Sequence, residues 1–448
     1  MIPGKENVMN TSLLHLHAPD HWINDPNGFL YYRGEYHLFY QYFPYAAAWG
    51  TMHWGHAVSR DLLHWEHKGI ALFPTVREDQ NGCFSGCAVE QDGEMVLFYT
   101  GVRYLTPNPR NIHVSLDGRM ESNQLTIHSA DGFAFDNWTG KQVVIPAITD
   151  PRVGDFSDAR DPKVWKGKDS WYLLLGTTVN QQGRVLLYES KDLTHWEYRS
   201  QAGLEDSCYG WMWECPNYVN APGGEVLLVS AMDFCPKGRK PDSVAACFPV
   251  HFSEASCTME ISPQYQLLDY GRDLYAPQTT LDEQGLPVLI AWVRMPTLTE
   301  DGWIGMFSAP RRIQVREGHI CFSLHPNVRK VCSCPISHPS QAFSAGYRVQ
   351  CSLKEGEWIN LGGFEIACRD GRICTDRTKV YPRQGVGPLL CQTPVLNRWE
   401  VEVLVEDHLV EVFVNDGEYT ITNAVYGLHR DWSGNLSGKI SFFTGREE

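Results

Sequence analysis

The feature of this sequence that most limits its fold is a β-hairpin pattern that recurs five times within the first 300 residues. Each copy joins two β-rich segments through a turn that contains glycine, the residue that tight hairpin turns favour. The hairpins are expected at residues 29–42, 88–99, 163–175, 218–229 and 279–293. Polar side chains suited to chemistry lie just before them: Asn24 and Asp25, Ser85, Arg160 and Asp161, Glu214, and Tyr275. Residues so widely spaced converge only if the hairpins surround a common axis, so the sequence predicts a five-bladed β-propeller.

A sequence segment that occurs more than once supports a repeated architecture. Residues 59–66 (SRDLLHWE) return as residues 190–197 (SKDLTHWE), and residues 129–131 with Trp138 form a looser third copy. Each copy follows its hairpin, where an outer blade strand and its turn are expected. We interpret the Asp and Trp residues of these copies as structural, holding a turn and covering a blade edge.

The rest of the chain predicts a second all-β domain. Its 448 residues are enough for one large and one smaller domain. Residues 326–339 are rich in Pro and read as a connector, and alternating apolar segments follow at 347–353, 399–405, 409–414 and 439–443. We therefore expect an all-β chain with a propeller at residues 1–325 and a β-sandwich at residues 340–448. The sandwich is expected to brace the first domain, and its basic stretch 369–383 to be a solvated loop.

Composition excludes several classes of partner. A net charge of −15 and a pI near 5.6 argue against nucleic acid and anionic membranes. The sequence has no apolar run of about 18 residues to span a bilayer and no signal-peptide pattern in residues 1–17, so a cytoplasmic location is expected. The 14 cysteines are expected to be free thiols, and His53, His56 and His64 to make internal hydrogen bonds. Neither a metal nor a cofactor is predicted, and the choice between monomer and homodimer stays open.

Three carboxylates stand out by their surroundings. Asp25 and Asp161 directly precede a proline, and Glu214 lies two residues before one. Proline restricts the backbone on either side of it, and a stiff backbone holds a side chain in one position. One such acid is more often a turn former, but three at matching hairpin positions predict an active site.

These segments resemble the motifs of a known enzyme family, glycoside hydrolase family 32, the β-fructofuranosidases that include invertases, sucrose-6-phosphate hydrolases and fructanases. The resemblance extends over nearly the whole chain and implies a five-bladed catalytic propeller followed by a β-sandwich. The matching segments are residues 22–28 (WINDPNG), 84–86 (FSG), 160–162 (RDP), 214–216 (ECP) and 275–278 (YAPQ), with Gln41, residues 49–50 and residues 52–56.

The chemistry requires two carboxyl groups in opposite protonation states. One must protonate the leaving oxygen, while the other stabilises positive charge at the anomeric carbon of the fructose. By resemblance, Asp25 is the nucleophile that forms a covalent fructosyl-enzyme, and Glu214 is first the acid and then the base. We expect the charge of Asp25 to raise the pKa of Glu214. Asp161 is expected to bind two ring hydroxyls, with Arg160 keeping it ionised.

Other residues are expected to bind the sugar through hydrogen bonds or apolar contact. Trp49 and Trp292 are predicted to form apolar walls, although blade packing is an alternative role for Trp292 and Tyr275. The predicted substrate-binding residues are Asn24, Gln41, Trp49, Phe84, Ser85, Arg160, Cys215, Tyr275 and Trp292.

Two departures from the family pattern concern the leaving-group side. Phe43 stands where Asn is more usual, and residues 46–48 are all alanine. This side is therefore expected to be apolar and permissive, which predicts an exo-acting enzyme that cleaves sucrose and short fructo-oligosaccharides with comparable efficiency. The basic residues Lys237, Arg239 and Lys240 either bind the phosphate of sucrose 6-phosphate or lie in a solvated loop, and the loop is favoured.

Two other functions compete with hydrolysis. A fructosyltransferase forms the same intermediate but passes fructose to a sugar instead of water. A sugar-binding propeller without catalysis would not need Asp25, Asp161 and Glu214 together, and all three are present.

Overall fold

The computed structural model describes residues 8–9, 14–235, 240–342, 346–382, 385 and 387–445. These residues are almost entirely β, as the sequence predicted. The described part contains one α-helix, α1 (Pro326–Val331), and four 3₁₀ turns, η1 (Arg77–Asp79), η2 (Ser207–Tyr209), η3 (Pro339–Gln341) and η4 (Thr378–Val380). No described helix is both long and apolar enough to cross a membrane.

Five antiparallel sheets precede residue 325 in the described chain, each built largely from consecutive strands. The first contains β2 (Trp22–Tyr32), β3 (Glu35–Phe43), β4 (His53–Ser59) and β5 (Glu66–Leu72), with β1 (Val8–Met9) added at the edge of β5. The second contains β6 (Cys83–Gln91), β7 (Glu94–Tyr104), β8 (Met120–Ser129) and β9 (Gln142–Ile145). The third contains β10 (Ala159–Lys166), β11 (Trp171–Val179), β12 (Gln182–Ser190) and β13 (Glu197–Gly203).

The fourth and fifth sheets each carry one extra short strand. The fourth contains β14 (Met212–Ala221), β15 (Gly224–Phe234), β16 (Asp242–Ser253), β17 (Thr258–Ile261) and β18 (Gln266–Leu267). The fifth contains β19 (Leu274–Leu281), β20 (Pro287–Val293), β21 (Met306–Phe307), β22 (Arg311–Arg316) and β23 (His319–Leu324).

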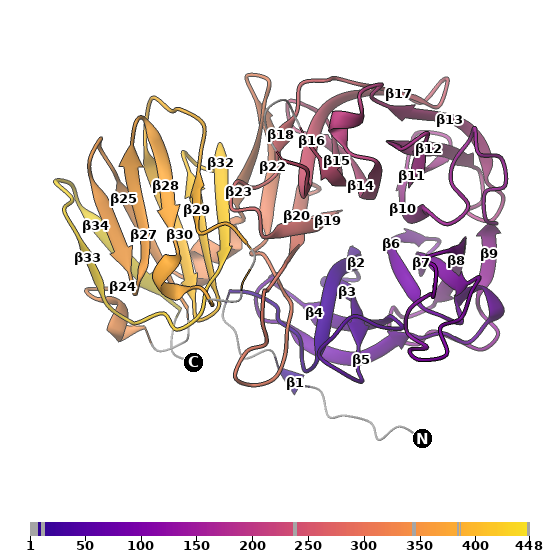
Figure 1. Ribbon diagram of the computed structural model, residues 1–448, viewed down its shortest axis with the longest axis horizontal. Coiled ribbons are helices and arrows are strands. Elements are labelled where there is room, and N and C mark those ends of the chain that lie inside the picture. The colour runs from indigo at the N-terminus through magenta and orange to yellow at the C-terminus, as the bar shows by residue number, and fades with distance from the viewer. Residues whose placement is uncertain are drawn as a thin grey trace.

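The first strands of these sheets contact one another in a closed cycle. Strand β2 contacts β6, β6 contacts β10, β10 contacts β14, β14 contacts β19, and β19 contacts β2 again. Figure 1 shows the sheets following one another around a common centre in chain order, with these strands innermost. Side chains from distant parts of the chain are therefore brought together at the centre.

Each innermost strand contains a break in register. The breaks fall between Ile23 and Pro26, Cys83 and Gly86, Arg160 and Lys163, Glu214 and Asn217, and Tyr275 and Pro277. A bulge of this kind accommodates proline inside a strand and redirects a side chain out of the alternating pattern. The sequence placed the polar site residues before the strands, but the bulges let each strand begin earlier and carry its site residues inside.

The repeated Ser-x-Asp segments hold turns, as predicted. The Asp61 side chain accepts the backbone N–H groups of Leu63 and His64, and Trp65 Nε1 donates to the Leu62 carbonyl. The second copy, at residues 190–197, repeats these bonds. The third copy keeps the turn through Asp131 but not the Trp, which is exposed at position 138.

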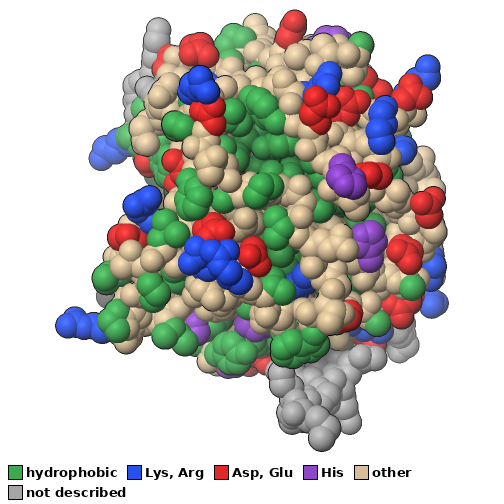
Figure 2. Space-filling view, turned by 90° about the vertical axis from the view of Figure 1, so that its right-hand side faces the viewer, with side chains coloured by type: hydrophobic (Ala, Val, Ile, Leu, Met, Phe, Trp, Pro, Cys, Tyr) green, Lys and Arg blue, Asp and Glu red, His purple; other side chains and the backbone are tan. Residues whose placement is uncertain are grey.

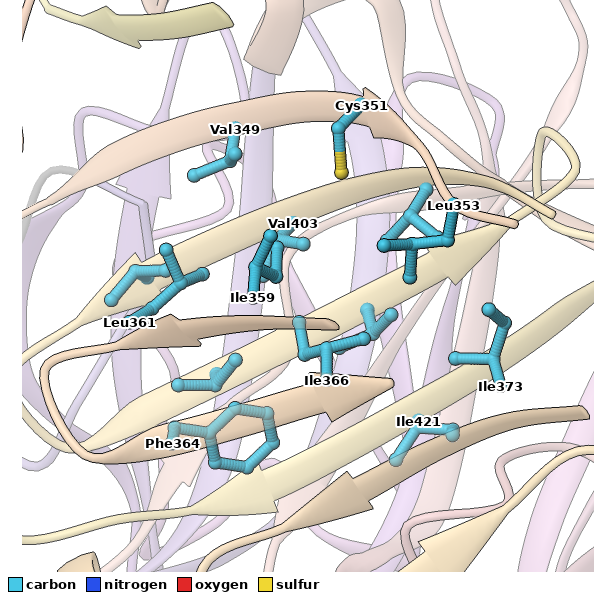
Figure 3. Close-up of a cluster of buried hydrophobic side chains, with 14 of the residues drawn as sticks. Val349, Cys351, Leu353, Ile359, Leu361, Phe364, Ile366, Ile373, Val403 and Ile421 are labelled. Carbon is cyan, nitrogen blue, oxygen red and sulfur yellow. The ribbon is translucent and has the colours of Figure 1, made fainter. Parts of the chain in front are cut away.

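The chain after residue 333 forms two further sheets. One contains β24 (Cys334–Ile336), β25 (Tyr347–Ser352), β30 (Glu400–Glu406), β31 (Leu409–Val414), β32 (Tyr419–Ala424) and β34 (Ile440–Thr444). The other contains β26 (Trp358–Leu361), β27 (Phe364–Arg369), β28 (Arg372–Asp376), β29 (Leu390–Gln392) and β33 (Trp432–Gly434). Both sheets contribute side chains to one apolar core, part of which is shown in Figure 3.

The structure adds detail to one expectation about this region and corrects another. The predicted connector at 326–339 contains α1 and the edge strand β24, which pairs with β34. The basic stretch 369–383 is not a solvated loop, because it contains β28 and η4. Arg377 within it is fully buried and ion-paired with Asp273. A side chain that finds a carboxylate across an interface can be buried, and local charge alone does not reveal the partner.

The outer surface mixes charges of both signs. Figure 2 shows the side of the molecule that carries β9 and β13, with acidic and basic side chains interspersed around a central group of hydrophobic ones. No continuous basic patch covers this face, in keeping with the net charge of −15.

Candidate active site

The bulges bring the three predicted carboxylates together at the centre of the closed cycle that the five sheets form. Cys215 lies between two of them, with its backbone N–H donating to Asp161 Oδ2 at 2.8 Å and its Sγ 3.6 Å from Asp25 Oδ2. Glu214 is the preceding residue on the same strand. Asp161 and Cys215 both have positive φ, 67° and 47°, and each precedes a proline. Strained backbone of this kind at a non-glycine residue is characteristic of functional sites.

Asp25 is held by a network of neutral donors. Asn24 Nδ2 donates to Asp25 Oδ1 at 3.1 Å, and Ser85 Oγ donates to Oδ2. Gln41 joins the two donors, accepting from Asn24 at 2.9 Å and donating to Ser85 at 2.6 Å. Burial raises the pKa of Asp25, and the charge of Glu214 raises it further, whereas the bonds from Ser85 and Asn24 lower it. The network therefore fixes the orientation of the carboxylate and partly offsets the cost of burying it.

The pKa of Asp161 is strongly raised. Burial raises its pKa to about 7, Glu214 and Asp25 add to the rise, and the charge of Arg160 opposes it. The backbone N–H of Asp161 donates to Thr100 Oγ1 at 2.9 Å, which anchors the bulge to the neighbouring sheet.

Glu214 is held at both oxygens. Arg160 Nη2 donates to Oε1 at 2.9 Å, and Tyr275 Oη donates to Oε2 at 2.7 Å. Arg160 also binds Asp158 at 2.6 Å. Arg160 therefore lowers the pKa of Asp161 through its charge, but burial outweighs this effect, so Arg160 does not hold the pKa at its ordinary value. The hydrogen bonds of Arg160 go to Glu214 and Asp158.

The predicted aromatic residues divide into two groups. Trp49, which is 39% exposed, meets Phe84 edge-on with ring centroids 6.0 Å apart, next to Ser85. Trp292 packs against Tyr275 and Cys215 on the other side of the site. The ring of Tyr275 is buried in this group, and its hydroxyl binds Glu214. Contact of Tyr275 with the sugar stays a prediction.

The leaving-group side differs in detail from the expectation. Phe43 is only 3% exposed and packs against Tyr45 and His113, so its ring supports the following loop and offers little surface. The exposed residues of that loop are Tyr45, Ala46, Ala48 and Trp49. Of the three basic residues considered for phosphate, Lys237 and Arg239 lie outside the described residues, and Lys240 is exposed.

Several contributors were not found from the sequence. Trp22 Nε1 donates to Asn24 Oδ1 at 2.8 Å, Thr100 anchors Asp161, and Asp158 shares Arg160 with Glu214. Trp22 lies within a predicted motif and Asp158 lies just before another, and these positions are a signal that could have found both residues. Thr100 carries no local signal. Among the described residues, no group of three or more His, Cys, Asp or Glu side chains is placed to hold a metal ion.

Comparison with known proteins agrees with this geometry. The family model "Glycosyl hydrolases family 32 N-terminal domain" matches residues 15–326, and "Glycosyl hydrolases family 32 C terminal" matches residues 340–447. The chain therefore belongs to glycosyl hydrolase family 32 and is a glycosidase, as the sequence motifs predicted.

Individual relatives cover nearly the full length of the chain. A raffinose invertase from Escherichia coli is 32% identical over 92% of this chain and 89% of its own length. A sucrose-6-phosphate hydrolase from Bacillus subtilis is 34% identical, covering 91% of this chain and 87% of its own. The solved β-fructofuranosidase of Bombyx mori is 30% identical with a TM-score of 0.81, over 98% of this chain and 94% of that one.

Proposed function

We propose that the chain is a retaining β-fructofuranosidase that releases terminal fructose from sucrose and short fructo-oligosaccharides. The observation that carries this proposal is the gathering of Asp25, Asp161 and Glu214 around Cys215 at the centre of the closed cycle of sheets. The names of the relatives support the substrate class, and a variant of the Bombyx mori enzyme has been solved in complex with sucrose.

The same proposal extends to the architecture. We take the five sheets to be the blades of a five-bladed propeller at residues 1–325, followed by a connector at 326–339 and a β-sandwich at 340–448. The closed cycle of contacts among β2, β6, β10, β14 and β19 supports five blades. The apolar core shared by the last two sheets supports the sandwich.

In the first step, a carboxylate oxygen of Asp25 bonds to the anomeric carbon while the bond to the leaving oxygen breaks. Glu214 gives its proton to that oxygen. In the second step, water attacks the anomeric carbon, Glu214 accepts the proton from water, and Asp25 leaves as a carboxylate. Asp161 binds ring hydroxyls and stabilises the positive charge that develops in both transition states. A retaining mechanism requires the carboxyl groups of Asp25 and Glu214 to lie about 5–5.5 Å apart.

Substitution of the two reacting carboxyls tests the roles. Asp25→Asn should abolish turnover, because no nucleophile remains. Glu214→Gln should lose most activity on sucrose but regain much of it on a fructoside with a good leaving group, which needs no proton. Proton NMR of the first product should show the β anomer. An α-anomeric first product, or equal loss on both substrates for Glu214→Gln, would contradict the assignment.

The exact substrate is tested by product analysis. We expect sucrose and 1-kestose to be cleaved within about tenfold of each other and long inulin or levan poorly, since one polar contact is worth about 1 kcal/mol and few are available on the leaving-group side. Sucrose 6-phosphate is the second candidate substrate, because several relatives are named sucrose-6-phosphate hydrolase. A strong preference for it, lost when Lys237, Arg239 and Lys240 are all changed to Ala, would replace the first proposal.

The amounts of glucose and fructose released from sucrose distinguish two alternative functions. A fructosyltransferase would release less fructose than glucose from sucrose, whereas a hydrolase releases equal amounts. A sugar-binding protein without catalysis would release neither. A cytoplasmic location stays a prediction from the sequence.

A further inference from the structure

A second arginine, Arg294, contacts a tyrosine that binds Glu214, the proposed acid and base. Arg294 directly follows β20, and its guanidinium carbon lies over the ring of Tyr275, 4.9 Å from the centroid. Its backbone N–H donates to the Asp273 carbonyl at 2.8 Å, and its Nη2 donates to the Arg272 carbonyl. Among the residues that the structure describes, Arg294 forms no ion pair with a carboxylate. Its charge lies over the aromatic ring of Tyr275 and also acts through space on Asp273 and Glu214.

The ring connects Arg294 to the reacting carboxyl. Tyr275 is 8% exposed, and its hydroxyl donates to Glu214 Oε2 at 2.7 Å. A cation over an aromatic face is attracted by the negative charge of that face. It draws electron density from the ring, and the phenol O–H becomes a stronger donor as a result. A stronger donor favours the ionised form of the carboxylate that accepts the bond.

We propose that Arg294 is a positioning residue that acts on Glu214 through Tyr275, favouring the carboxylate form of Glu214 that must take a proton from water in the second step. This inference rests on the proposed role of Glu214. It gives the two oxygens of Glu214 separate cationic support, from Arg160 directly at Oε1 and from Arg294 through the Tyr275 ring at Oε2.

Other titratable groups near Glu214 also contribute to the electrostatics of the site. Asp25 and Asp161 have raised pKa values, chiefly through burial. Burial also raises the pKa of the Cys215 thiol and of Tyr275, so both stay neutral across the working pH range. Removing Arg294 leaves all of these groups and Arg160 in place.

The pH dependence of kcat/KM on sucrose tests the proposal. Arg294→Met removes the cation but keeps an apolar stem over the ring. In the proposed mechanism the alkaline limb follows loss of the proton from the acid of the first step. We expect it to move up by at most about half a pH unit, because only the part of the cation–π attraction that differs between the two protonation states shifts the limb. Arg294→Lys keeps the charge and should leave the limb close to that of the wild type.

Two further variants distinguish an effect that passes through Tyr275 from a general effect of removing an arginine. In a Tyr275→Phe background the hydroxyl is absent, so Arg294→Met should cause a much smaller shift, from the direct charge of Arg294 on Glu214 alone. Arg33 provides a matched control, because it lies over Tyr32 at the same 4.9 Å but in a hairpin turn outside the site. Arg33→Met should leave the pH profile unchanged.

The proposal is wrong if Arg294→Met leaves the alkaline limb in place, or if its shift persists in full when Tyr275 is Phe. If Arg294→Met does not fold, Arg294→Gln carries the same expectations, and thermal melts identify folded variants. Full activity of Glu214→Gln on sucrose would instead refute the proposed function, which keeps the two failures distinct.

Discussion

Asp161 combines a positive φ of 67° with burial of its carboxylate, and both features oppose folding. Among the residues that the structure describes, its carboxylate accepts one backbone N–H and one thiol, both from Cys215, and the nearby charges of Glu214 and Asp25 disfavour ionisation. A residue that is unfavourable in the folded state persists when the site needs it. The stability of the folded chain should therefore improve when the charge of Asp161 is removed.

We predict that Asp161→Asn abolishes activity but raises the free energy of unfolding at pH 8. The folded pKa of Asp161, about 7, lies above its ordinary value of 3.8. The protonated form is thus favoured by folding, and its contribution is present below pH 3.8 and lost as the pH rises through 7. Asn stays neutral, tolerates positive φ, and should gain roughly 2 kcal/mol at pH 8 but little at pH 4.

Urea denaturation at both pH values measures this difference. Asp192 is the comparison, because its exposed carboxylate accepts backbone N–H groups that lower its pKa. Asp192→Asn should lose stability at pH 8. An Asp161→Asn variant less stable than the wild type at pH 8 would contradict the argument.

Segments of neighbouring sheets approach one another closely next to the reacting groups, and glycine permits this. Gly176 on β11 pairs with Arg160, and a Cβ at this position would lie 2.1 Å from the carbonyl oxygen of Trp213. Gly305 has a similar place beside the first sheet, where a Cβ would lie 2.0 Å from the Ile23 carbonyl. In both cases the atom that a Cβ would clash with belongs to the backbone, which cannot rotate away as a flexible side chain can.

We predict that Gly176→Ala destabilises the fold by about 1–3 kcal/mol, the usual cost of overpacking. It should also lower kcat/KM, because displacement of Trp213 moves Glu214 away from Arg160 on the facing strand. Chemical denaturation and sucrose hydrolysis measure the two effects. Gly438→Ala is the control, since its Cβ would meet nothing nearer than 3.9 Å and should change neither quantity. Wild-type kinetics in Gly176→Ala would show that Glu214 is not positioned by this contact.

The first five sheets and the last two are joined by a buried ionic network. Arg311 on β22 is fully buried and donates to Glu411 on β31 and to Asp269. His15 lies between Glu406 and Glu411, at 2.7 and 2.8 Å, and so ties the N-terminal segment to the same network. Buried charges require such partners, and this arrangement fixes the relative position of the two parts of the molecule.

The network should make overall stability depend on pH. Burial lowers the pKa of His15, but Glu406 and Glu411 outweigh it and raise the pKa to about 9. The folded state therefore binds the proton more tightly, and this contribution is complete below pH 6.5 and lost as the pH rises through 9. We predict that the wild type loses roughly 3 kcal/mol more than His15→Gln between pH 6 and pH 9.5.

Guanidinium unfolding at the two pH values measures that difference. The exposed His195 provides the control, and His195→Gln should follow the wild type. Identical pH dependence in His15→Gln and the wild type would show that His15 is not charged in the folded protein.

The sequence predicted the hairpins well because their turns are local. Arg33 and Gly34 have φ values of 50° and 86°, and Asp92 and Gly93 have 53° and 83°, as a tight hairpin turn requires. The family motifs also identified Asp25, Asp161 and Glu214 as one group, and their proximity in the structure agrees. The starts of the innermost strands were predicted too late, because a bulge that admits proline depends on the neighbouring strand.

The sequence by itself determined what depends on neighbouring residues: the all-β class, the hairpin turns, the Ser-x-Asp turns and the motif acids. Only the tertiary structure decided that Arg160 binds Glu214, that Arg377 is buried beside Asp273, and that Arg294 lies over Tyr275. Burial and ion pairing depend on the distance between groups far apart in the chain. No local pattern encodes that distance, and packing of the sheets sets it.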